Sequence, residues 1–332
     1  MLHALPPAQI ENAPGGQAAQ SAQPAVELDQ AARDVAFPGF NKFPLRGTVL
    51  AARGLPWLAV LVPDSGPLDR DWVNPMLPGS HGGRAVAEWL RAQGVASLRY
   101  DKRIHGSRDP GLDSSLDAQE GDVAAALAAA RELPEARDRK LLLVGHGEGA
   151  LLSLLAARQA DALLLLGMPP QSMAGTIAAQ IRPQLPAAFA APNMAYLEQV
   201  FQAIRDHRSL PAAGAEVHPG LVRLGGAIMA PETLDFVRAT LDLDPWILAA
   251  RAVAPVALVW GDRDVMAWKP ETIPASFHGT VLEIPEANHL LKRERRPRAE
   301  LNGASALAGY GDEVPLADLA PVAAWLRALP EK

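Results

Sequence analysis

The strongest constraint on the fold of this chain is the alternation of short, continuously apolar segments with longer segments of helical pattern. The segments LAVLVP (58–63) and, after Lys140, KLLLVG (140–145) are too continuous in apolar residues for a strand with one solvated face, and VASLRYD (95–101) is a further expected strand. Helical patterns lie between them, around residues 84–94 and 117–134. Strands buried on both faces and joined by crossover helices predict an α/β fold with a doubly wound, mainly parallel sheet.

The alternation stops after the next expected strand, ALLLLGMP (162–169), and resumes at PVALVWGDRD (255–264). Between these two strands lie helical patterns broken by Pro and Gly, without a strand pattern. We therefore expect an α/β core formed by residues 31–169 and 256–332, and a helical cap formed by the inserted residues 170–255. A cap of this kind covers the carboxyl ends of the strands, where open α/β sheets bind their ligands.

The first 30 residues are rich in Ala, Gln, Pro and Gly, and we expect them to form a flexible N-terminal extension. They contain no Lys, no Arg and no sustained apolar run, which argues against an intact signal peptide. We expect a cytoplasmic protein, or a periplasmic or secreted one if a signal peptide has been removed. The sequence has no uncharged apolar stretch of the ~18 residues that a transmembrane helix needs, so we expect no membrane partner.

The charge balance favours a small-molecule partner over a nucleic acid. The net charge is −6 and the pI is near 5.8, whereas a duplex-binding surface needs clustered Lys and Arg. The dense basic run KRERRPR (292–298) is interrupted by Glu294 and Pro297, and we expect it to be a solvated loop. The absence of cysteine excludes a disulfide, a thiolate nucleophile and a cysteine-ligated metal site.

A glycine-rich turn follows the expected strand 140–145 and allows two interpretations. Gly145, Gly147 and Ala150 satisfy the dinucleotide-binding pattern G-x-G-x-x-A, and the same segment differs by one residue from G-x-S-x-G, the nucleophile elbow of hydrolases. A dinucleotide site uses the first strand of its unit and an acidic residue at the end of the next strand. Here at least three strands come first and Asp161 precedes the next strand, which disfavours a dinucleotide cofactor.

The hydrolase interpretation requires an acid and a histidine on loops after later strands, in the order nucleophile, acid, histidine. Asp264 ends the expected strand 255–264, and His289 ends the next strand segment, GTVLEIPEANH (279–289). Alone, either residue has an ordinary structural explanation. Their order and their places after strands, together with the elbow pattern, predict a hydrolase site at this edge of the sheet.

These segments resemble the α/β-hydrolase superfamily from about residue 45 to the C-terminus. Within it, the chain is similar to a bacterial esterase-like group whose motifs read HGSGPxDRD, LRYDKRGxGxS and GHSEGA. The corresponding segments here are PDSGPLDRD (63–71), LRYDKRIHGS (98–107) and GHGEGA (145–150). The resemblance also covers Asp244–Pro245 and the final segment YGDEVPLADLAPVAAWL (310–326).

The resemblance implies a mechanism in which an elbow serine attacks an acyl carbonyl. By position, His289 then acts as base and acid, Asp264 orients its imidazole, and the backbone N–H groups of Ser65 and Glu148 stabilise the oxyanion. By the same motifs, the resemblance places Gly66 and His146 beside these donors, in the oxyanion and substrate-binding part of the site. The resemblance implies neither a cofactor nor a metal. Although His146, His289 and an acid could hold a metal, no H-x-H or H-E-x-x-H spacing supports a metal site.

The departures from these motifs fall on the catalytic segments. Pro63 and Asp64 replace the His-Gly that leads the oxyanion loop, and Asp64 brings a negative charge to a site that must accept another. Ile104 and His105 lie in a stretch that is normally rich in glycine. Gly147 stands at the position of the nucleophilic serine, where glycine avoids the cost of about 1–3 kcal/mol that a strained elbow backbone imposes on other residues.

Three functions remain open from the sequence. We favour a carboxylic ester hydrolase with a small-molecule substrate, present in a form engineered to lack its nucleophile, because Asp264 and His289 are retained. The altered loops instead favour a natural pseudoenzyme that binds a small apolar ligand. A third alternative is a cofactor-free enzyme in which the His289–Asp264 pair activates water or removes a proton directly.

Overall fold

The computed structural model describes residues 32–73, 77, 79–109 and 111–330. The predicted N-terminal extension, residues 1–30, lies outside the described residues. Among the residues that the structure describes, no helix is long and apolar enough to cross a bilayer.

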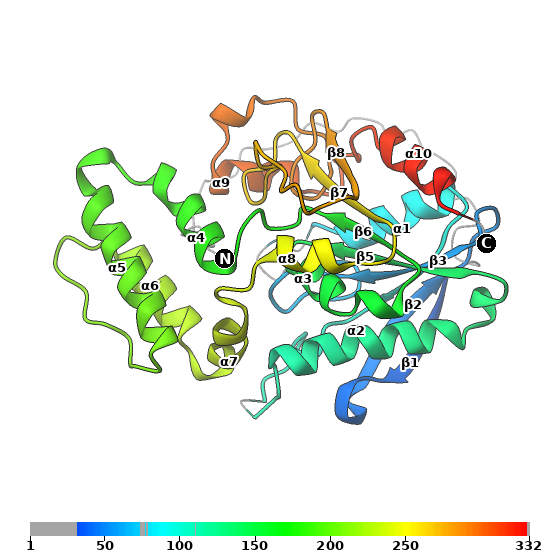
Figure 1. The fold of residues 1–332 in the computed structure, drawn as a ribbon, viewed down its shortest axis with the longest axis horizontal. Coiled ribbons are helices and arrows are strands. Elements are labelled where there is room, and N and C mark those ends of the chain that lie inside the picture. The colour runs from blue at the N-terminus through cyan, green and yellow to red at the C-terminus, as the bar shows by residue number, and fades with distance from the viewer. Residues whose placement is uncertain (1–31, 74–76, 78, 110, 331–332) are drawn as a thin grey trace, which may run out of the picture.

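The centre of the molecule is an eight-stranded sheet in the order β1-β2-β4-β3-β5-β6-β7-β8 (Figure 1). β1 and β2 form an antiparallel hairpin, and β2 pairs antiparallel with β4. The remaining neighbours in this order, β4-β3-β5-β6-β7-β8, are all parallel. The strands are β1 (Ala32–Pro38), β2 (Pro44–Leu50), β3 (Trp57–Val62), β4 (Ala96–Tyr100), β5 (Lys140–His146), β6 (Ala162–Leu166), β7 (Val256–Gly261) and β8 (Thr280–Ile284). This arrangement confirms the predicted doubly wound, mainly parallel sheet.

Helices cover both faces of the sheet. The helices are α1 (Gly82–Ala92), α2 (Leu116–Arg131), α3 (Glu148–Leu155), α4 (Met173–Ile181), α5 (Ala187–Arg205), α6 (Pro219–Ile228), α7 (Pro231–Thr240), α8 (Pro245–Arg251), α9 (Gly303–Ala306) and α10 (Ala320–Ala328). α1 and α10 share one hydrophobic cluster with the strands, whereas α2 and α3 pack in clusters formed with the opposite strand faces. The strands β3 to β6 are buried on both faces, and this burial accounts for their mainly apolar sequences.

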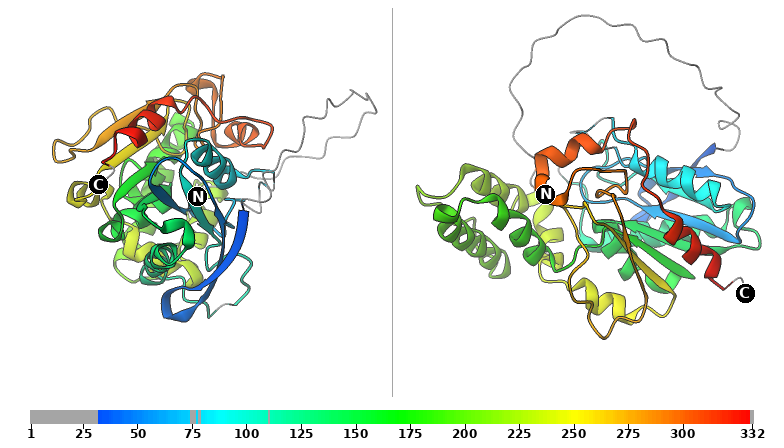
Figure 2. Two further views of the ribbon diagram at one scale, coloured as in Figure 1. Left: turned by 90° about the vertical axis from the view of Figure 1, so that its right-hand side faces the viewer. Right: turned by 90° about the horizontal axis from the view of Figure 1, so that it is seen from above.

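The inserted segment 170–255 is helical, and it holds α4 to α8. α4 to α7 enclose a hydrophobic cluster of their own, which includes Leu197, Phe201 and Leu224. Figure 1 and the right-hand view of Figure 2 show α5 and α6 projecting to one side of the sheet. α8 differs, because its Trp246 and Ala249 pack with α3, β6 and β7 in the core. By packing, the cap therefore consists of α4 to α7, and α8 lies with the sheet.

The basic run 292–298 is not the fully solvated loop that we expected. The side chain of Lys292 is buried, and its Nζ donates hydrogen bonds to the carbonyls of Tyr310 and Gly311 at 2.8 Å each. Glu294 is also buried and accepts two hydrogen bonds from the guanidinium of Arg296. Part of this run therefore anchors the C-terminal loops, because its charged atoms find partners inside the fold.

Candidate active site

The glycine-rich turn forms a sharp connection between β5 and α3. β5 ends at His146, Gly147 takes the left-handed backbone angle φ 55° with ψ −118°, and α3 begins at Glu148. Cβ atoms added to the flanking glycines would collide with backbone: at Gly145 with the first turn of α3, and at Gly149 with the carbonyls of Val62 and Pro63. The close packing of strand and helix around this turn therefore depends on those two glycines.

His289 and Asp264 meet as their order in the chain predicts. Asp264 follows β7, His289 follows β8, and the Nδ1 atom of His289 lies 2.7 Å from Oδ2 of Asp264. The other carboxylate oxygen of Asp264 accepts hydrogen bonds from the backbone N–H groups of Met266 (2.7 Å) and Ala267 (2.9 Å). Asp264 is 1 % exposed, so its carboxylate is held rigidly behind the imidazole.

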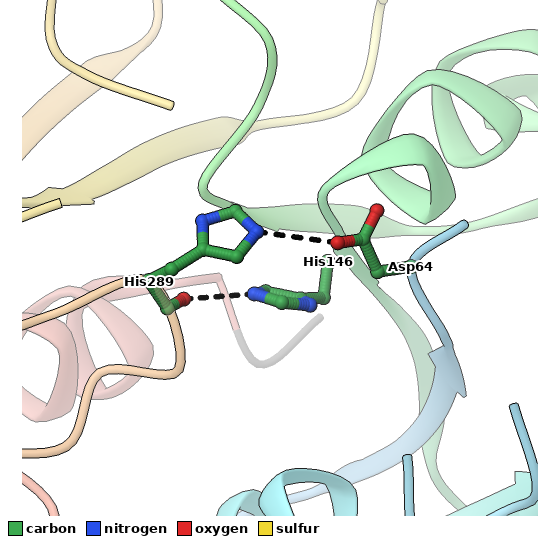
Figure 3. A group of neighbouring side chains, drawn as sticks. All are labelled: Asp64, His146 and His289. Atoms are coloured by element: carbon green, nitrogen blue, oxygen red, sulfur yellow. Dashed lines mark hydrogen bonds and ion pairs between the residues drawn. The ribbon is translucent and has the colours of Figure 1, made fainter. Parts of the chain in front are cut away.

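The carboxylate of Asp64 fills the centre of the site. Its Oδ1 atom accepts hydrogen bonds from the backbone N–H groups of Ser65 (2.6 Å) and Glu148 (2.8 Å), the two predicted oxyanion donors. Its Oδ2 atom lies 3.2 Å from Nε2 of His289, and Figure 3 shows the two side chains pointing toward each other. The two N–H groups that the sequence predicted as oxyanion donors therefore converge on one point, and an oxygen of this chain accepts from both.

Asp64 and Gly147 fit each other sterically. A Cβ atom added to Gly147 would overlap the Oδ1 and Cγ atoms of Asp64, and φ of Gly147 is itself unfavourable for a side chain. The Asp64 carboxylate thus lies in the space that the side chain of an elbow residue would enter. The sequence shows the charge of Asp64 but not this placement, because Asp64, in the loop after β3, and Glu148, at the elbow, lie 84 residues apart and only the fold brings them together.

The hydrogen-bond partners of His289 determine its protonation. Both ring nitrogens face carboxylate oxygens, which only accept hydrogen bonds, so both nitrogens carry protons. Burial opposes this charge, but the charges and hydrogen bonds of Asp264 and Asp64 outweigh it and raise the pKa of His289 to about 10. For Asp64, burial alone would raise the pKa, because it disfavours the charged carboxylate. The hydrogen bond from His289 and nearby positive charge outweigh burial and hold the pKa of Asp64 well below its usual range.

His146 packs against His289 and hydrogen-bonds to its backbone. Its Nε2 atom lies 2.8 Å from the backbone carbonyl of His289, so Nε2 carries the proton and donates it (Figure 3). The His146 ring stacks on Trp72 with 4.9 Å between centroids, and it lies 4.5 Å from the His289 ring centroid. Burial, followed by the charge of His289, lowers the pKa of His146 to about 4. His146 is therefore a neutral packing partner of His289.

Among the described residues, Asp64, His146 and His289 form a group whose potential metal-ligating atoms all lie within 4.8 Å of one another. In this arrangement Nε2 of His289 and Oδ2 of Asp64 bind each other, and Nε2 of His146 donates to a carbonyl. The group thus forms a hydrogen-bonded ion pair, Asp64–His289, with a neutral histidine, His146, beside it.

The remaining serines near the site have other partners. Ser153, on the buried face of α3, donates a hydrogen bond from Oγ to the carbonyl of Gly149 at 2.7 Å. Ser107 is exposed, and its Oγ accepts a hydrogen bond from the N–H of Asp109. Gly66 follows Ser65 with φ 91°, and the space where its Cβ would lie is open. Of the positions predicted for the site, the structure brings together Ser65, His146, Gly147, Glu148, Asp264 and His289.

Comparison with solved structures identifies the architecture. An α/β-hydrolase, GrgF from Penicillium sp. sh18, superposes with a TM-score of 0.50 at 16 % identity, covering 78 % of this chain and 91 % of that one. The esterase Pf2001 from Pyrococcus furiosus superposes with a TM-score of 0.50 at 14 % identity, covering 82 % and 88 %. The chain has the α/β-hydrolase fold. No protein-family model and no curated protein matches the sequence.

Within this α/β-hydrolase fold, the segment DKR (101–103) at the end of β4 ties the site to the core. Lys102 is buried, and its Nζ donates hydrogen bonds to the carbonyl of Asp64 at 3.1 Å and to Oε1 of Glu148 at 2.9 Å. It thereby links the two segments that hold the Asp64 carboxylate. In the sequence, Lys102 was visible only as part of the motif LRYDKR, and no site role was predicted for it.

Proposed function

We propose that this chain is a hydrolase of small molecules whose site is built around glycine at 147 and a carboxylate at 64. The observation that carries the proposal is the position of the Asp64 carboxylate, which accepts hydrogen bonds from both oxyanion donors and faces His289. A site that had merely lost its serine would have no carboxylate there. The hydrolytic pair His289–Asp264 is retained at 2.7 Å, which supports a working site over a binding pocket alone.

The fit between Asp64 and Gly147 supports a natural origin of the glycine over an engineered one. If serine had been replaced in the laboratory, the Asp64 side chain of the parent would have had to turn away from the space that it fills beside Gly147, and so from both N–H donors. A carboxylate at 64 and a glycine at 147 are instead compatible with each other and with the backbone. We therefore prefer a natural origin of the glycine to the engineered form that the retention of Asp264 and His289 suggested.

To test the proposal, the unmodified chain is assayed against a panel of short-chain aryl esters, lactones, epoxides and alkyl halides. We expect hydrolysis of at least one class, lost by a factor of about 10³ or more in His289→Ala, because the imidazole serves as base and acid. A matched control is His278→Ala, which replaces an exposed histidine on the loop before β8 and should retain turnover. If no class is turned over faster than by His289→Ala, the proposal is wrong.

A serine-type carboxylic ester hydrolase is the second candidate, favoured by the His289–Asp264 pair and by the convergence of the Ser65 and Glu148 N–H groups. We expect Gly147→Ser alone to remain unlabelled by a fluorophosphonate probe, because Asp64 overlaps the new side chain. The double variant Asp64→Gly with Gly147→Ser should gain labelling and aryl esterase activity. Activity in Gly147→Ser alone would show that the carboxylate does not define the site.

A further inference from the structure

We infer that Asp64 is the covalent nucleophile of this site, and that its Oδ2 atom is alkylated by a substrate carrying an electrophilic saturated carbon, such as an epoxide or an alkyl halide. The inference rests on the proposed hydrolase function and names its substrate class. No residue of the elbow offers a nucleophile, because position 147 is glycine and the neighbouring Glu148 is ion-paired with Lys102 at 2.9 Å. Carboxylates are established covalent nucleophiles in other hydrolytic enzymes.

The oxyanion donors identify the carbon at which hydrolysis occurs. Two backbone N–H groups that converge on one oxygen stabilise negative charge that develops on that oxygen. Here the oxygen is Oδ1 of Asp64, so the stabilised tetrahedral centre is Cγ of Asp64 itself. Such a centre forms only when water attacks an ester of Asp64. The donor geometry therefore points to an enzyme-bound ester as the intermediate.

The two carboxylate oxygens of Asp64 have different surroundings. Oδ1 is held by the N–H groups of Ser65 and Glu148, whereas Oδ2 faces His289 at 3.2 Å. The side chain is 19 % exposed and the adjacent Gly66 faces open space, so a substrate can approach. An acyl substrate would develop negative charge on its own carbonyl oxygen, yet the oxyanion donors are already engaged by Oδ1. An alkyl substrate needs no such donors in the first step.

The chemistry balances with the groups present. Oδ2 bonds to a carbon of the epoxide ring, the ring C–O bond breaks, and the departing oxygen takes the proton from Nε2 of His289. The neutral imidazole then removes a proton from water, whose oxygen bonds to Cγ while the negative charge moves onto Oδ1. The Cγ–Oδ2 bond breaks, and the alcohol leaves with Oδ2 and with the proton from His289. Asp64 retains the oxygen of water and returns its carboxyl proton to His289.

Alkylation also prepares His289 for the second step. In the resting site, His289 is held between the carboxylates of Asp64 and Asp264, and an imidazolium between two negative charges is a proton donor. Esterification removes the charge of Asp64 and leaves one carboxylate beside the ring. After epoxide opening, the neutral imidazole that remains is a base for water, so one residue performs both proton transfers. After a bromide leaves, the imidazolium lies beside only one carboxylate, releases its proton to bulk water and then acts as the same base.

A single-turnover experiment in water labelled with heavy oxygen tests the inference, with the full chain in excess over epoxyhexane or bromohexane. Alkylation of Asp64 predicts that the first product molecules carry no label and that the peptide containing Asp64 gains one heavy oxygen atom. Asp64→Asn should form no labelled peptide, and Asp109→Asn, on an exposed loop after β4, should behave as the unmodified chain. Label in the product and none in the peptide would overturn the inference and leave the proposed hydrolase function intact.

The two electrophiles separate the steps. A bromide leaves without a proton, so His289→Gln should still be alkylated by bromohexane and should accumulate hexyl-Asp64, detected by peptide mass. Epoxide opening requires the proton of His289, and its rate should fall by about 10²–10⁴-fold in the same variant. His289-dependent ester turnover without turnover of either electrophile refutes the nucleophile and retains the hydrolase. Absence of all His289-dependent turnover refutes both.

Discussion

At the scale of single residues, the charge on Asp64 controls the proton on His289. The imidazole lies between Asp264 at 2.7 Å and Asp64 at 3.2 Å; Asp264 is fully buried, and the side chain of Asp64 is 19 % exposed. Water screens these charges weakly, so each carboxylate contributes strongly to holding the proton. Replacement of one carboxylate by an amide removes a charge with little change of shape.

This arrangement predicts a pH dependence of stability. The pKa of His289 is raised from 6.5 to about 10 in the folded chain, so its stabilising contribution is complete below pH 6.5 and is lost as the pH rises through about 10. Urea unfolding measured across this range should show a declining free energy of unfolding, and the decline should be shallower in Asp64→Asn. Nuclear magnetic resonance titration of the His289 ring should give a lower pKa in that variant. An unchanged pKa would contradict the assigned ion pair.

At the scale of elements, the end of β4 joins the β1–β2 turn, the loop after β3 and α2. Arg70 binds the carboxylate of Asp101 at 2.6 Å, and Arg103 binds that of Asp122 on α2 at 2.6 Å. Asp122 also accepts a hydrogen bond from the N–H of Phe40 at 2.9 Å. The motif DKR therefore uses each of its three charged residues to attach a different segment to the strand end.

The buried pair Arg103–Asp122 gives a stability prediction. Both side chains are less than 5 % exposed, so Asp122→Asn leaves the guanidinium of Arg103 buried without its countercharge. We expect a loss of about 3–5 kcal/mol in the free energy of unfolding, measured by urea denaturation. Glu132→Gln, at the exposed end of the same helix, is the matched control and should change stability by less than about 0.5 kcal/mol. Equal effects of the two changes would argue against a structural role for the pair.

At the scale of the whole molecule, most buried apolar residues of the cap form a hydrophobic cluster of their own, and Phe236 of α7 packs instead in a cluster of the sheet. The cap cluster is formed by residues of α4 to α7, and Phe201 is among its most buried members. Contacts between cap and core include the hydrogen bonds from Gln180 to Met266 and from Ser114 to Glu232, both at 2.6 Å. Parts of a protein that have their own hydrophobic clusters can unfold locally, each with its own free energy of unfolding.

We therefore expect Phe201→Ala to loosen the cap more than the sheet. The change removes a buried ring and should lower the free energy of unfolding by about 3–5 kcal/mol. Because Phe201 belongs to the cap cluster, we expect this loss mainly in the cap. Hydrogen exchange should accelerate in α5, α6 and α7, while amides of β3 to β6 keep their protection. Leu142→Ala in the central strand β5 is the comparison, and it should lower protection across the sheet. Equal acceleration in cap and sheet after Phe201→Ala would contradict the separation.

The sequence predicted the sheet and the pair Asp264–His289, because continuous apolar strands and the order of loops along a parallel sheet are local patterns. It did not predict the antiparallel strands β1 and β2. The residues of β1, Ala32–Pro38, are mostly exposed, and β2, Pro44–Leu50, alternates exposed and buried residues over its first half, so neither carries a continuous apolar run like those of the parallel strands. It also missed Asp64 as the centre of the site. That placement depends on the distance between two loops, and a pattern along the chain does not contain such a distance.

The space shared by Asp64 and a side chain at 147 couples the two positions. A Cβ atom at 147 would overlap the Asp64 carboxylate, so a larger residue there requires the carboxylate to turn away from the N–H groups of Ser65 and Glu148. Substitutions at residues in contact are non-additive. In a double-mutant cycle, Gly147→Ser should therefore destabilise the chain less in the presence of Asp64→Gly than alone, which makes positions 64 and 147 a single unit for any redesign of this site.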